Sequence, residues 1–497
     1  MSDDFSAAGE PAIDLVEMTV EKAQAGFAER SFTSAALAQA FLDRIAAYNP
    51  HYNAIIFVNP DALADAREID RRRATGEALG PLAGVPVVVK DTMDMVGLPS
   101  TGGWSLLCSR TGGVDLMPGT DSPVVARMRA AGAVILGKTN VPEFGFTAAS
   151  LNMIFPPTRN PWNTELTAGG SSSGSGAAVA AGIGPFAVGG DGGGSIRIPA
   201  AINGVYGLKG SMGRVPLYPG TKDERYPGVS SWESLEHIGP LSRTVADAAL
   251  MMSVIAGPDD RDRATLPEPA FEWMDVIKGD IRGLKVAYSP DLGYAVVDPE
   301  VREICGRAAQ VFENSLGCHV ETTNPGWADP FGSLVTIIKA ETDLSGMRKL
   351  IAKYRDQISP GLADWLMAPL TDEQISDATM GRKAIANASW KFMRRYDLLL
   401  TPTVAVPAFP YQLPGPETID GQKVGPFQWI AFTGFCNVTG QPAASVPAGF
   451  TKAGLPVGLQ IVGRHLGDAT VLRASAAFEA ASPWQDKWPA MVSQKEL

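Results

Sequence analysis

Apolar residues near the N-terminus recur every three or four positions, as on one face of an amphipathic helix. The residues that form this pattern are Leu37, Ala40, Phe41 and Ile45. The pattern predicts helix across residues 13–47, and a hydroxyl at Thr33 or Ser34 can cap a helix by accepting from a backbone N–H one turn later. Residues 62–74 continue the helical pattern with many charges, which predicts an exposed face.

Farther along the chain, short runs of β-branched and aliphatic residues predict strands that are buried on both faces. These runs cover residues 85–90, 133–136, 186–188, 284–288, 398–400, 444–446 and 457–462. They alternate with helical segments. The sequence therefore predicts an α/β fold, with a mixed, mostly buried β-sheet flanked by helices.

The chain has 497 residues, which at the usual domain size allows about three domains. Its chemical motifs argue for one, because they are spread from position 90 to near position 440. We predict a single domain over residues 1–497. Within it, residues 1–75 form an N-terminal helical segment, residues 76–250 a catalytic core, and residues 295–396 a mostly helical variable region.

Composition and charge exclude several classes of protein. Hydrophobic residues make up 45% of the chain and charged residues 19%, which is ordinary for a globular protein. The net charge of −11 argues against a nucleic-acid partner, since such a protein normally has a basic face. The acidic N-terminus lacks the apolar region of a signal peptide, and no apolar run approaches the roughly 18 residues of a membrane span. We predict a cytoplasmic protein with no nucleic-acid or membrane partner, for which a homodimer stays open.

The four cysteines and four histidines are scattered along the chain. They show neither the spacing of a zinc site nor a disulfide framework. We predict no metal and no cofactor.

Three short motifs match known patterns but lack the context that those patterns need. Residues 132–139 (GAVILGKT) fit a phosphate-loop pattern, yet the residues between the glycines are apolar and indicate a strand. Residues 170–174 (GSSSG) would make Ser172 a hydrolase nucleophile, but a poor strand precedes them. The later glycines do not complete a dinucleotide-binding pattern, because Ser195 stands in its last position.

Residues 169–199 are unusually rich in glycine and serine. Glycine loses more chain entropy on folding than any other residue, so this composition is tolerated where backbone N–H groups must approach something closely. A developing oxyanion beside a nucleophilic serine is the natural candidate. The stretch presents two serines for that chemistry, Ser171 and Ser195.

Lys90 ends the apolar run PVVVK. A lysine with an ordinary pKa of about 10.4 is protonated at neutral pH, but burial beside apolar strands can lower that value by several units. A neutral lysine can then take a proton from a serine. From the local sequence alone, a solvated charge at a strand end is the alternative.

Several segments together resemble the signature of the amidase signature family. They are GVPVVVKDT around Lys90, GGSSSGSGAAVAAG from residue 169, GGDGGGSIRIPA from residue 189, and GLKGS from residue 207. Agreement extends to GAVILGKTNVPEF, RNPWN, GPLSRTVADAAL and NVTGQPAASVPAG. The resemblance covers roughly residues 35–488 and implies the fold of that family.

The resemblance also implies a reaction and its residues. Family members hydrolyse carbon–nitrogen bonds of amides, anilides or carbamates through a Ser-cisSer-Lys triad and an acyl-enzyme. By position in the motifs, Ser195 is the nucleophile, Ser171 is the relay that follows a cis peptide bond, and Lys90 is the general base.

The loop around the nucleophile is covered by the same resemblance. It implies an oxyanion hole made of the amides of Gly192, Gly193 and Gly194. Asp191 and Arg197 flank the nucleophile, and we expect them to hold the loop by charge-assisted hydrogen bonds, although the sequence alone equally allows a surface ion pair. Gly190 is a departure, since many members have threonine at this position.

We predict a small-molecule amide as substrate, with an apolar or aryl acyl group. The aromatic residues that could line its pocket, and that could equally be ordinary core, are Trp104, Phe144, Phe146, Phe155, Trp429 and Phe435. Two alternatives stay open. One is the glutaminase subunit of a tRNA-dependent amidotransferase, which shares the signature, and the other is a non-catalytic binding protein on the same fold.

Overall fold

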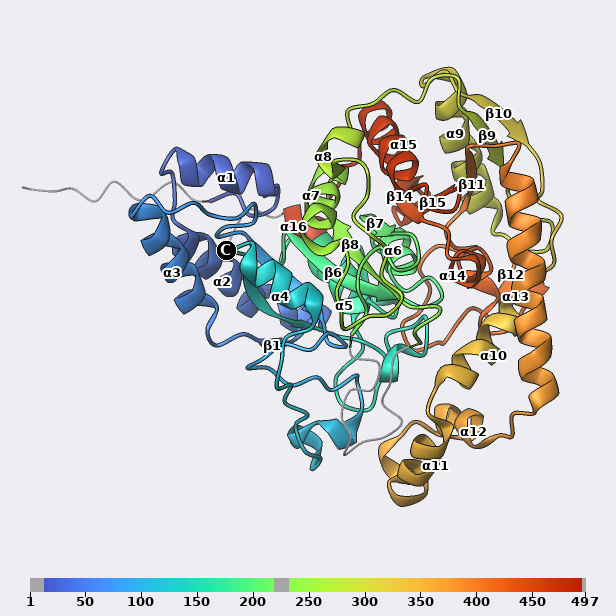
Figure 1. The fold of residues 1–497 in the computed structure, drawn as a ribbon, viewed down its shortest axis with the longest axis horizontal. Coiled ribbons are helices and arrows are strands. Elements are labelled where there is room, and N and C mark those ends of the chain that lie inside the picture. Colours follow the sequence, from blue (N-terminus) through green and yellow to red (C-terminus); the bar gives the residue numbers. More distant parts are fainter. Residues whose placement is uncertain (1–12, 219–231, 494–497) are drawn as a thin grey trace, which may run out of the picture.

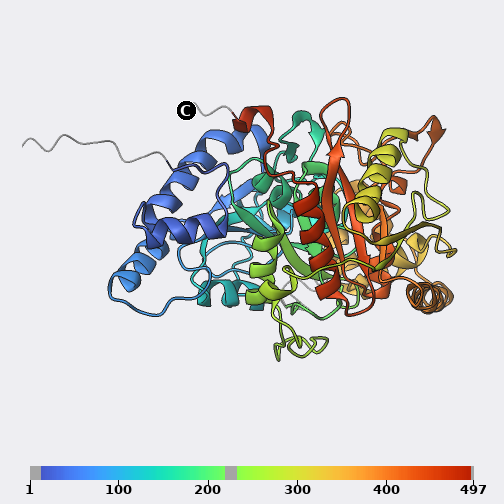
Figure 2. The ribbon, with the colours of Figure 1, turned by 90° about the horizontal axis from the view of Figure 1, so that it is seen from above.

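The computed structural model describes residues 13–218 and 232–493. Within these residues, one mixed sheet of eleven strands crosses the molecule, and helices flank it to form a single domain (Figure 1). Seen from above, the N-terminal helices lie at one end of the molecule, and the C-terminal helix packs beside them (Figure 2). In the described part of the chain, no helix combines the length and the apolar character that a membrane span requires.

The spatial order of the strands differs from their order in the chain. From one edge to the other, the strands are β1 (Ile55–Val58), β3 (Val134–Thr139), β2 (Pro86–Lys90), β6 (Phe186–Asp191), β8 (His237–Ser242), β7 (Tyr206–Lys209), β14 (Ala443–Phe450), β15 (Pro456–Gly463), β11 (Leu398–Pro402), β9 (Lys285–Tyr288) and β10 (His319–Thr322). β3, β2 and β6 are parallel, as are β11, β9 and β10, whereas the pairs from β6 across to β11 are antiparallel. Two small pairs stand apart: β4 (Arg159–Asn160) with β5 (Asn163–Thr167), and β12 (Thr418–Ile419) with β13 (Gln422–Lys423).

The helices lie in groups that follow the chain. They are α1 (Val20–Ala28), α2 (Ser34–Tyr52), α3 (Ala62–Ala74), α4 (Pro123–Ala130), α5 (Ser173–Ala180), α6 (Arg197–Asn203), α7 (Val245–Ile255), α8 (Trp273–Val276), α9 (Pro299–Asn314), α10 (Phe331–Glu341), α11 (Leu344–Lys353), α12 (Pro360–Met367), α13 (Asp372–Met393), α14 (Gly434–Thr439), α15 (Asp468–Ala481) and α16 (Ala490–Ser493). Figure 1 shows α1–α3 at one end of the molecule and α10–α13 along the opposite side.

The predicted strands are confirmed, because every predicted run overlaps one of β2, β3, β6, β9, β11, β14 and β15. The sequence pattern did not reveal β1, β7, β8 and β10. β7 (YGLK) and β8 (HIGPLS) carry a glycine or a proline inside the strand, and these residues interrupt the apolar run that marks a buried strand.

The prediction of helix across residues 13–47 is wrong in its continuity. The helix is interrupted between α1 and α2, where Arg30 adopts a left-handed φ of 58°. The cap at Thr33 is confirmed, since its side chain accepts from the N–H of Ala36 at 3.0 Å. The helix predicted over residues 62–74 is confirmed as α3.

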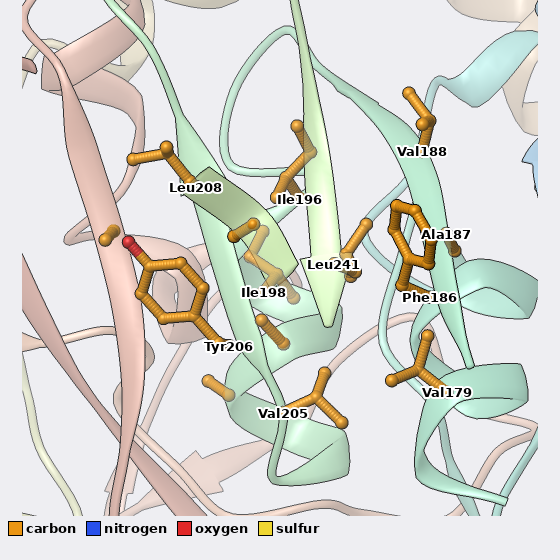
Figure 3. Packing of buried hydrophobic residues seen from close by; sticks show 14 of the residues in the cluster. Val179, Phe186, Ala187, Val188, Ile196, Ile198, Val205, Tyr206, Leu208 and Leu241 are labelled. Atoms are coloured by element: carbon orange, nitrogen blue, oxygen red, sulfur yellow. The ribbon is translucent and has the colours of Figure 1, made fainter. Parts of the chain in front are cut away.

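The centre of the sheet fixes the turn that follows β6. β6, β7 and β8 are buried along their whole lengths. Figure 3 shows Ile196 and Ile198 among the side chains of these strands, close to Leu208 and Leu241. Since burial of such a side chain contributes about 1.5–3 kcal/mol, the residues just after position 195 are anchored by the core.

Candidate active site

The parallel strands β2 and β6 bring two distant segments to one edge of the sheet. Val88 pairs with Ala187 and Val89 with Val188, so the carboxyl ends of both strands lie side by side. β2 ends at Lys90 and β6 ends at Asp191. Polar groups that follow parallel strands are therefore collected at this edge.

Lys90 and Ser171 are in direct contact there. Lys90 Nζ donates to Ser171 Oγ at 2.8 Å and to the carbonyl of Gly190 at 3.1 Å. Both side chains are buried, with Lys90 only 2% exposed. The Gly170–Ser171 peptide bond is cis. Lys90 is thus a buried amine that is held against a serine hydroxyl, and the surface charge allowed by the local sequence is excluded.

Ser195 lies in the turn between β6 and α6. The N–H of Ser172 donates to the carbonyl of Ser195 at 3.1 Å, which ties the two serine segments together. Ser195 lines a cavity and is 9% exposed. The structure therefore brings Lys90, Ser171 and Ser195 to one edge of the sheet, as the motifs imply.

Ser172 and Lys138, which belong to the two motifs set aside above, are both buried and hydrogen-bonded within the fold. Ser172 is fully buried, and its Oγ donates to the carbonyl of Gly190 at 3.1 Å and accepts from the N–H of that residue at 3.2 Å. Lys138 lies in β3, where its Nζ donates to the carbonyl of Met93 at 2.7 Å and to Ser100 Oγ at 3.0 Å.

The amides before and at Ser195 differ in what they bind. In the described residues, the N–H groups of Gly192, Gly193 and Ser195 donate to no protein acceptor. The N–H of Gly194 instead donates to Asp191 Oδ1 at 2.7 Å. This corrects the expectation for Gly194, because an amide that is bonded to a buried carboxylate is not available to an oxyanion. The N–H of Ser195 itself, which the sequence analysis did not consider, donates to no acceptor among the described residues.

Asp191 and Arg197 form a buried ion pair that closes the loop around Ser195. Arg197 Nε and Nη2 each lie 3.0 Å from one Asp191 oxygen, and both side chains are fully buried. Burial opposes ionisation of Asp191, but attraction to the Arg197 guanidinium outweighs it and holds the pKa of the carboxyl well below its ordinary value. The pair is therefore ionised at every pH where the protein is expected to work.

Residues from the C-terminal third complete this pair. Arg197 Nη1 donates to the carbonyl of Thr433 at 3.0 Å and to Gln460 Oε1 at 2.6 Å, while Nη2 donates to Asn437 Oδ1 at 2.7 Å. Asn437 Nδ2 in turn donates to Asp191 Oδ1 at 2.9 Å. Every polar group of the pair thus has a partner, as a buried charge requires. Sequence reasoning missed these three residues.

Lys209 and His237 lie behind the loop, also fully buried from solvent or nearly so. Lys209 Nζ is 3.2 Å from His237 Nε2. Burial, followed by repulsion from Arg197, lowers the pKa of Lys209 to about 7. Burial, followed by repulsion from Lys209, holds the pKa of His237 well below its ordinary value. His237 is a packed, hydrogen-bonded side chain and lines neither of the cavities described next.

Two cavities meet at the edge of the sheet where Lys90, Ser171 and Ser195 lie. The smaller, of about 80 Å³, is lined by Lys90 and Ser171 and by polar side chains that include Tyr218 and Glu236. The larger, of about 670 Å³, is lined by Gly193 and Ser195. The rest of the larger wall is mostly apolar and includes Leu151, Phe331, Leu334, Val335, Ile338, Phe427 and Ile430.

Residues 344–367, here called the cap, lie over both cavities through α11, α12 and the turn between them. Leu362 and Trp365 of the cap line both cavities. The cap packs around a hydrophobic cluster of its own, which is separate from the main core. The buried residues of this cluster are Met347, Ile351, Ile358, Leu362, Ala363 and Leu366.

A family model described as amidase matches residues 36–472. The chain belongs to the amidase family. Among characterised relatives, an acylamidase of Rhodococcus erythropolis is 38% identical over 480 residues, which cover 94% of this amidase and 96% of the relative. One subunit of the glutamyl-tRNA(Gln) amidotransferase of Chloroflexus aggregans is 34% identical, covering 96% of this chain and 99% of that relative.

Solved structures agree with this assignment. A bacterial aryl acylamidase of the amidase signature family superposes with a TM-score of 0.87 at 32% identity, covering 97% of this chain and 99% of that one. A 6-aminohexanoate cyclic dimer hydrolase, solved with its substrate, superposes with a TM-score of 0.81 at 28% identity, covering 97% and 100%. This amidase is accordingly a hydrolase of amide carbon–nitrogen bonds, built on the amidase signature fold.

The six aromatic residues suggested for the pocket divide into two groups. Phe144 and Phe146 line the cavities of this amidase, and Trp104 packs behind Phe144 with ring centroids 5.0 Å apart. Phe155, Trp429 and Phe435 line neither cavity and are core residues, packed against Phe57, Phe409 and Trp327 respectively. Aromatic identity does not reveal which side of an element faces a cavity, so sequence could not separate these groups.

Proposed function

We propose that this amidase cleaves its substrate through an acyl-enzyme on Ser195. The proposal is supported by the 2.8 Å hydrogen bond between Lys90 Nζ and Ser171 Oγ beside the Ser195 turn. Ser195 Oγ attacks the amide carbonyl carbon. Its proton passes to Ser171 Oγ, whose own proton passes to Lys90 Nζ. The reverse transfer protonates the leaving amine, and water then hydrolyses the ester that remains on Ser195.

The oxyanion of the tetrahedral intermediate binds, in this proposal, to the amides of Gly192, Gly193 and Ser195. They donate to no protein acceptor in the described residues, so they are available to a ligand. Loss of one such donor typically costs about 2.7–4 kcal/mol of transition-state stabilisation.

The acyl group of the substrate occupies the larger cavity, and the amine leaves through the smaller one. Ser171 and Lys90, which return the proton to the amine, line the smaller cavity, whereas Ser195 lines the larger. The apolar wall of the larger cavity favours an aliphatic or aryl acyl group. The similarity to an acylamidase and to an aryl acylamidase supports the same class. We therefore propose amides and anilides of apolar acids as substrates.

The test is a hydrolysis panel of amides, anilides, esters and carbamates with Ser195→Ala, Ser171→Ala and Lys90→Ala. We expect each variant to lose at least about 10³-fold in kcat for the best amide, because the three groups act as a unit. The melting temperature should change little in Ser195→Ala. Mass spectrometry should detect a fluorophosphonate adduct on Ser195 in the wild type. Amide hydrolysis that persists in Ser195→Ala would overturn the proposal.

A glutaminase that feeds ammonia to a partner protein is the second candidate. The similarity to the amidotransferase of Chloroflexus aggregans favours it. The apolar wall of the larger cavity disfavours it, since the polar side chain and charged groups of glutamine would lose water there without partners. Glutamine should therefore be cleaved at least about 100-fold more slowly, in kcat/KM, than the best apolar amide. Efficient glutaminase activity together with copurification of a second protein would reverse this choice.

A further inference from the structure

The smaller cavity contains a carboxylate that the proposed chemistry has not used. Glu236 immediately precedes β8 and is half-buried in the cavity wall beside Lys90 and Ser171. Its side-chain oxygens accept no hydrogen bond and form no ion pair with the described residues. A carboxylate that lines the cavity beside Lys90 and Ser171, and that no described side chain binds, is a candidate for a role in the site.

Gly190 is the reason that this carboxylate can face Lys90. An ideal Cβ on Gly190 would lie 3.1 Å from Glu236 Oε1 and 3.4 Å from Lys90 Nζ. The acid and the amine therefore both border the space that a larger residue 190 would fill. Because residue 190 is glycine, no side chain at this position comes between the carboxylate and the amine.

The other charged groups nearby are engaged elsewhere. Asp91 follows Lys90, but its carboxylate accepts from Thr101 Oγ1 at 2.7 Å and lies 3.7 Å from Lys138 Nζ. Asp191 follows Gly190 and is paired with Arg197. Tyr218 also lies in the described wall of the smaller cavity. Among the described residues, Glu236 is thus a carboxylate that borders the same space as Lys90 and is not engaged elsewhere.

We propose that Glu236 is a positioning residue whose negative charge stabilises Lys90 in its protonated form during catalysis. This inference rests on the proposed triad. When the proton of Ser195 reaches Lys90 through Ser171, the neutral amine becomes an ammonium ion. The negative charge of the Glu236 carboxylate favours that ammonium and hence the tetrahedral intermediate. Glu236 touches neither the reacting carbonyl nor the leaving amine in this scheme.

Glu236→Gln tests the proposal, because glutamine keeps the shape and removes the charge. Acylation is followed with the 4-nitroanilide of the acyl group that the wild type cleaves fastest. We expect kcat to fall about 10- to 100-fold at alkaline pH with KM within about twofold, as a charge at this range typically shifts proton affinity by one to two powers of ten. The loss should shrink toward acid pH, because without the carboxylate a larger fraction of Lys90 is neutral. Half-maximal activity on the acid side should therefore move to lower pH.

Two variants and a second measurement control the experiment. Glu236→Asp keeps the charge and should retain more activity than Glu236→Gln. Glu233→Gln removes a carboxylate three residues away that pairs with Arg263 outside the site, and should leave the pH profile unchanged. The rate of Ser195 labelling by a fluorophosphonate reports its nucleophilicity without any amide, and Glu236→Gln should slow it.

An unchanged pH profile and labelling rate in Glu236→Gln would overturn this inference while leaving the triad intact. Equal losses in Glu236→Gln and Glu236→Asp would also overturn it, since they would indicate a role for shape instead of charge. Failure of the triad itself is recognised separately, by amide hydrolysis that survives Ser195→Ala.

Discussion

The loop around Ser195 and the cap that covers it are held in opposite ways. The loop rests on one buried ion pair, Asp191–Arg197, whose polar groups are all bonded and whose neighbours Ile196 and Ile198 are in the main core. The cap has a hydrophobic cluster of its own, against which Phe144 and Phe146 of the body pack, and side chains of the body also bind its backbone. Among these, Lys339 Nζ donates to the carbonyl of Trp365 at 2.6 Å, and Ser105 Oγ donates to that of Gln357 at 2.8 Å.

The two kinds of attachment suit two different tasks, with the loop suited to the bond-breaking chemistry and the cap to the selection of the substrate. In the proposed function Ser195 is a nucleophile, which must be held within a fraction of an ångström, and the ion pair that supports its loop has all its polar groups bonded inside the core. A wall that selects an acyl group needs only to exclude water and fit a shape, which a separately packed element can do. Changes in the loop should therefore abolish turnover, and changes in the cap should redirect it.

Arg197→Met should break the loop and have the largest effect. Removal of one partner leaves Asp191 charged and buried, which typically costs about 3–5 kcal/mol of stability. We also expect kcat to fall by about 100-fold or more in whatever protein folds, because the loop shifts. Chemical denaturation and steady-state kinetics measure the two effects.

Arg214→Met provides the matched control for that change. Arg214 is also buried and lies 3.3 Å from Asp468, but it is outside both cavities. It should lower stability with kcat of the folded fraction nearly unchanged. If both variants kept full kcat, the special role given to the Asp191–Arg197 pair would be wrong.

Trp365→Ala should change substrate choice with a smaller effect on chemistry. The Trp365 ring lies 4.5 Å from that of Phe146, and both residues line both cavities. Loss of this buried surface should raise KM about 10-fold for the best aryl substrate, with kcat within about threefold. Bulkier acyl groups should gain in relative kcat/KM. Trp390→Ala, which removes a 59% exposed ring on α13, should leave all of these values unchanged. A collapse of kcat in Trp365→Ala would remove the distinction between loop and cap.

Glu143→Gln should give the smallest effect, on the attachment of the cap. Glu143 is buried and its carboxylate accepts from the N–H of Ser359 in the cap at 3.1 Å. Burial raises the pKa of Glu143 above its ordinary 4.5. Folding therefore favours the protonated acid, and this contribution is complete below about pH 4.5 and is lost as the pH rises through the raised pKa. Glutamine stays neutral and can still accept from Ser359, so the variant should melt about 1–2 °C higher than wild type at pH 8 and similarly at pH 4.5. A variant that melts lower than the wild type at pH 8 would contradict the predicted direction of this stability change.

The sequence could predict candidate site residues where those residues stand in a recognisable local pattern. Lys90 at the end of a buried strand, and the serines within the glycine-rich stretch, could be named before the fold was known. Thr433, Asn437 and Gln460 could not, because each contributes one or two polar atoms to a buried pair and no spacing marks them. Glu236 was hidden for a similar reason, since its relation to Lys90 depends on the space above Gly190. The pairing of β7 and β8 was missed because glycine and proline interrupt their apolar pattern.

The distance along the chain between Arg197 and its partners also sets when the enzyme can become active. Residues 90, 171 and 195 are all synthesised early, yet the loop that presents Ser195 needs the carbonyl of Thr433 and the side-chain amides of Asn437 and Gln460. A nascent chain that emerges from the ribosome therefore carries every reacting group long before it has a working nucleophile. A fragment that ends near residue 250 lacks the supports for that loop. If Ser195 is the nucleophile, we expect activity only after residues 433–460 have been made and have folded against the loop.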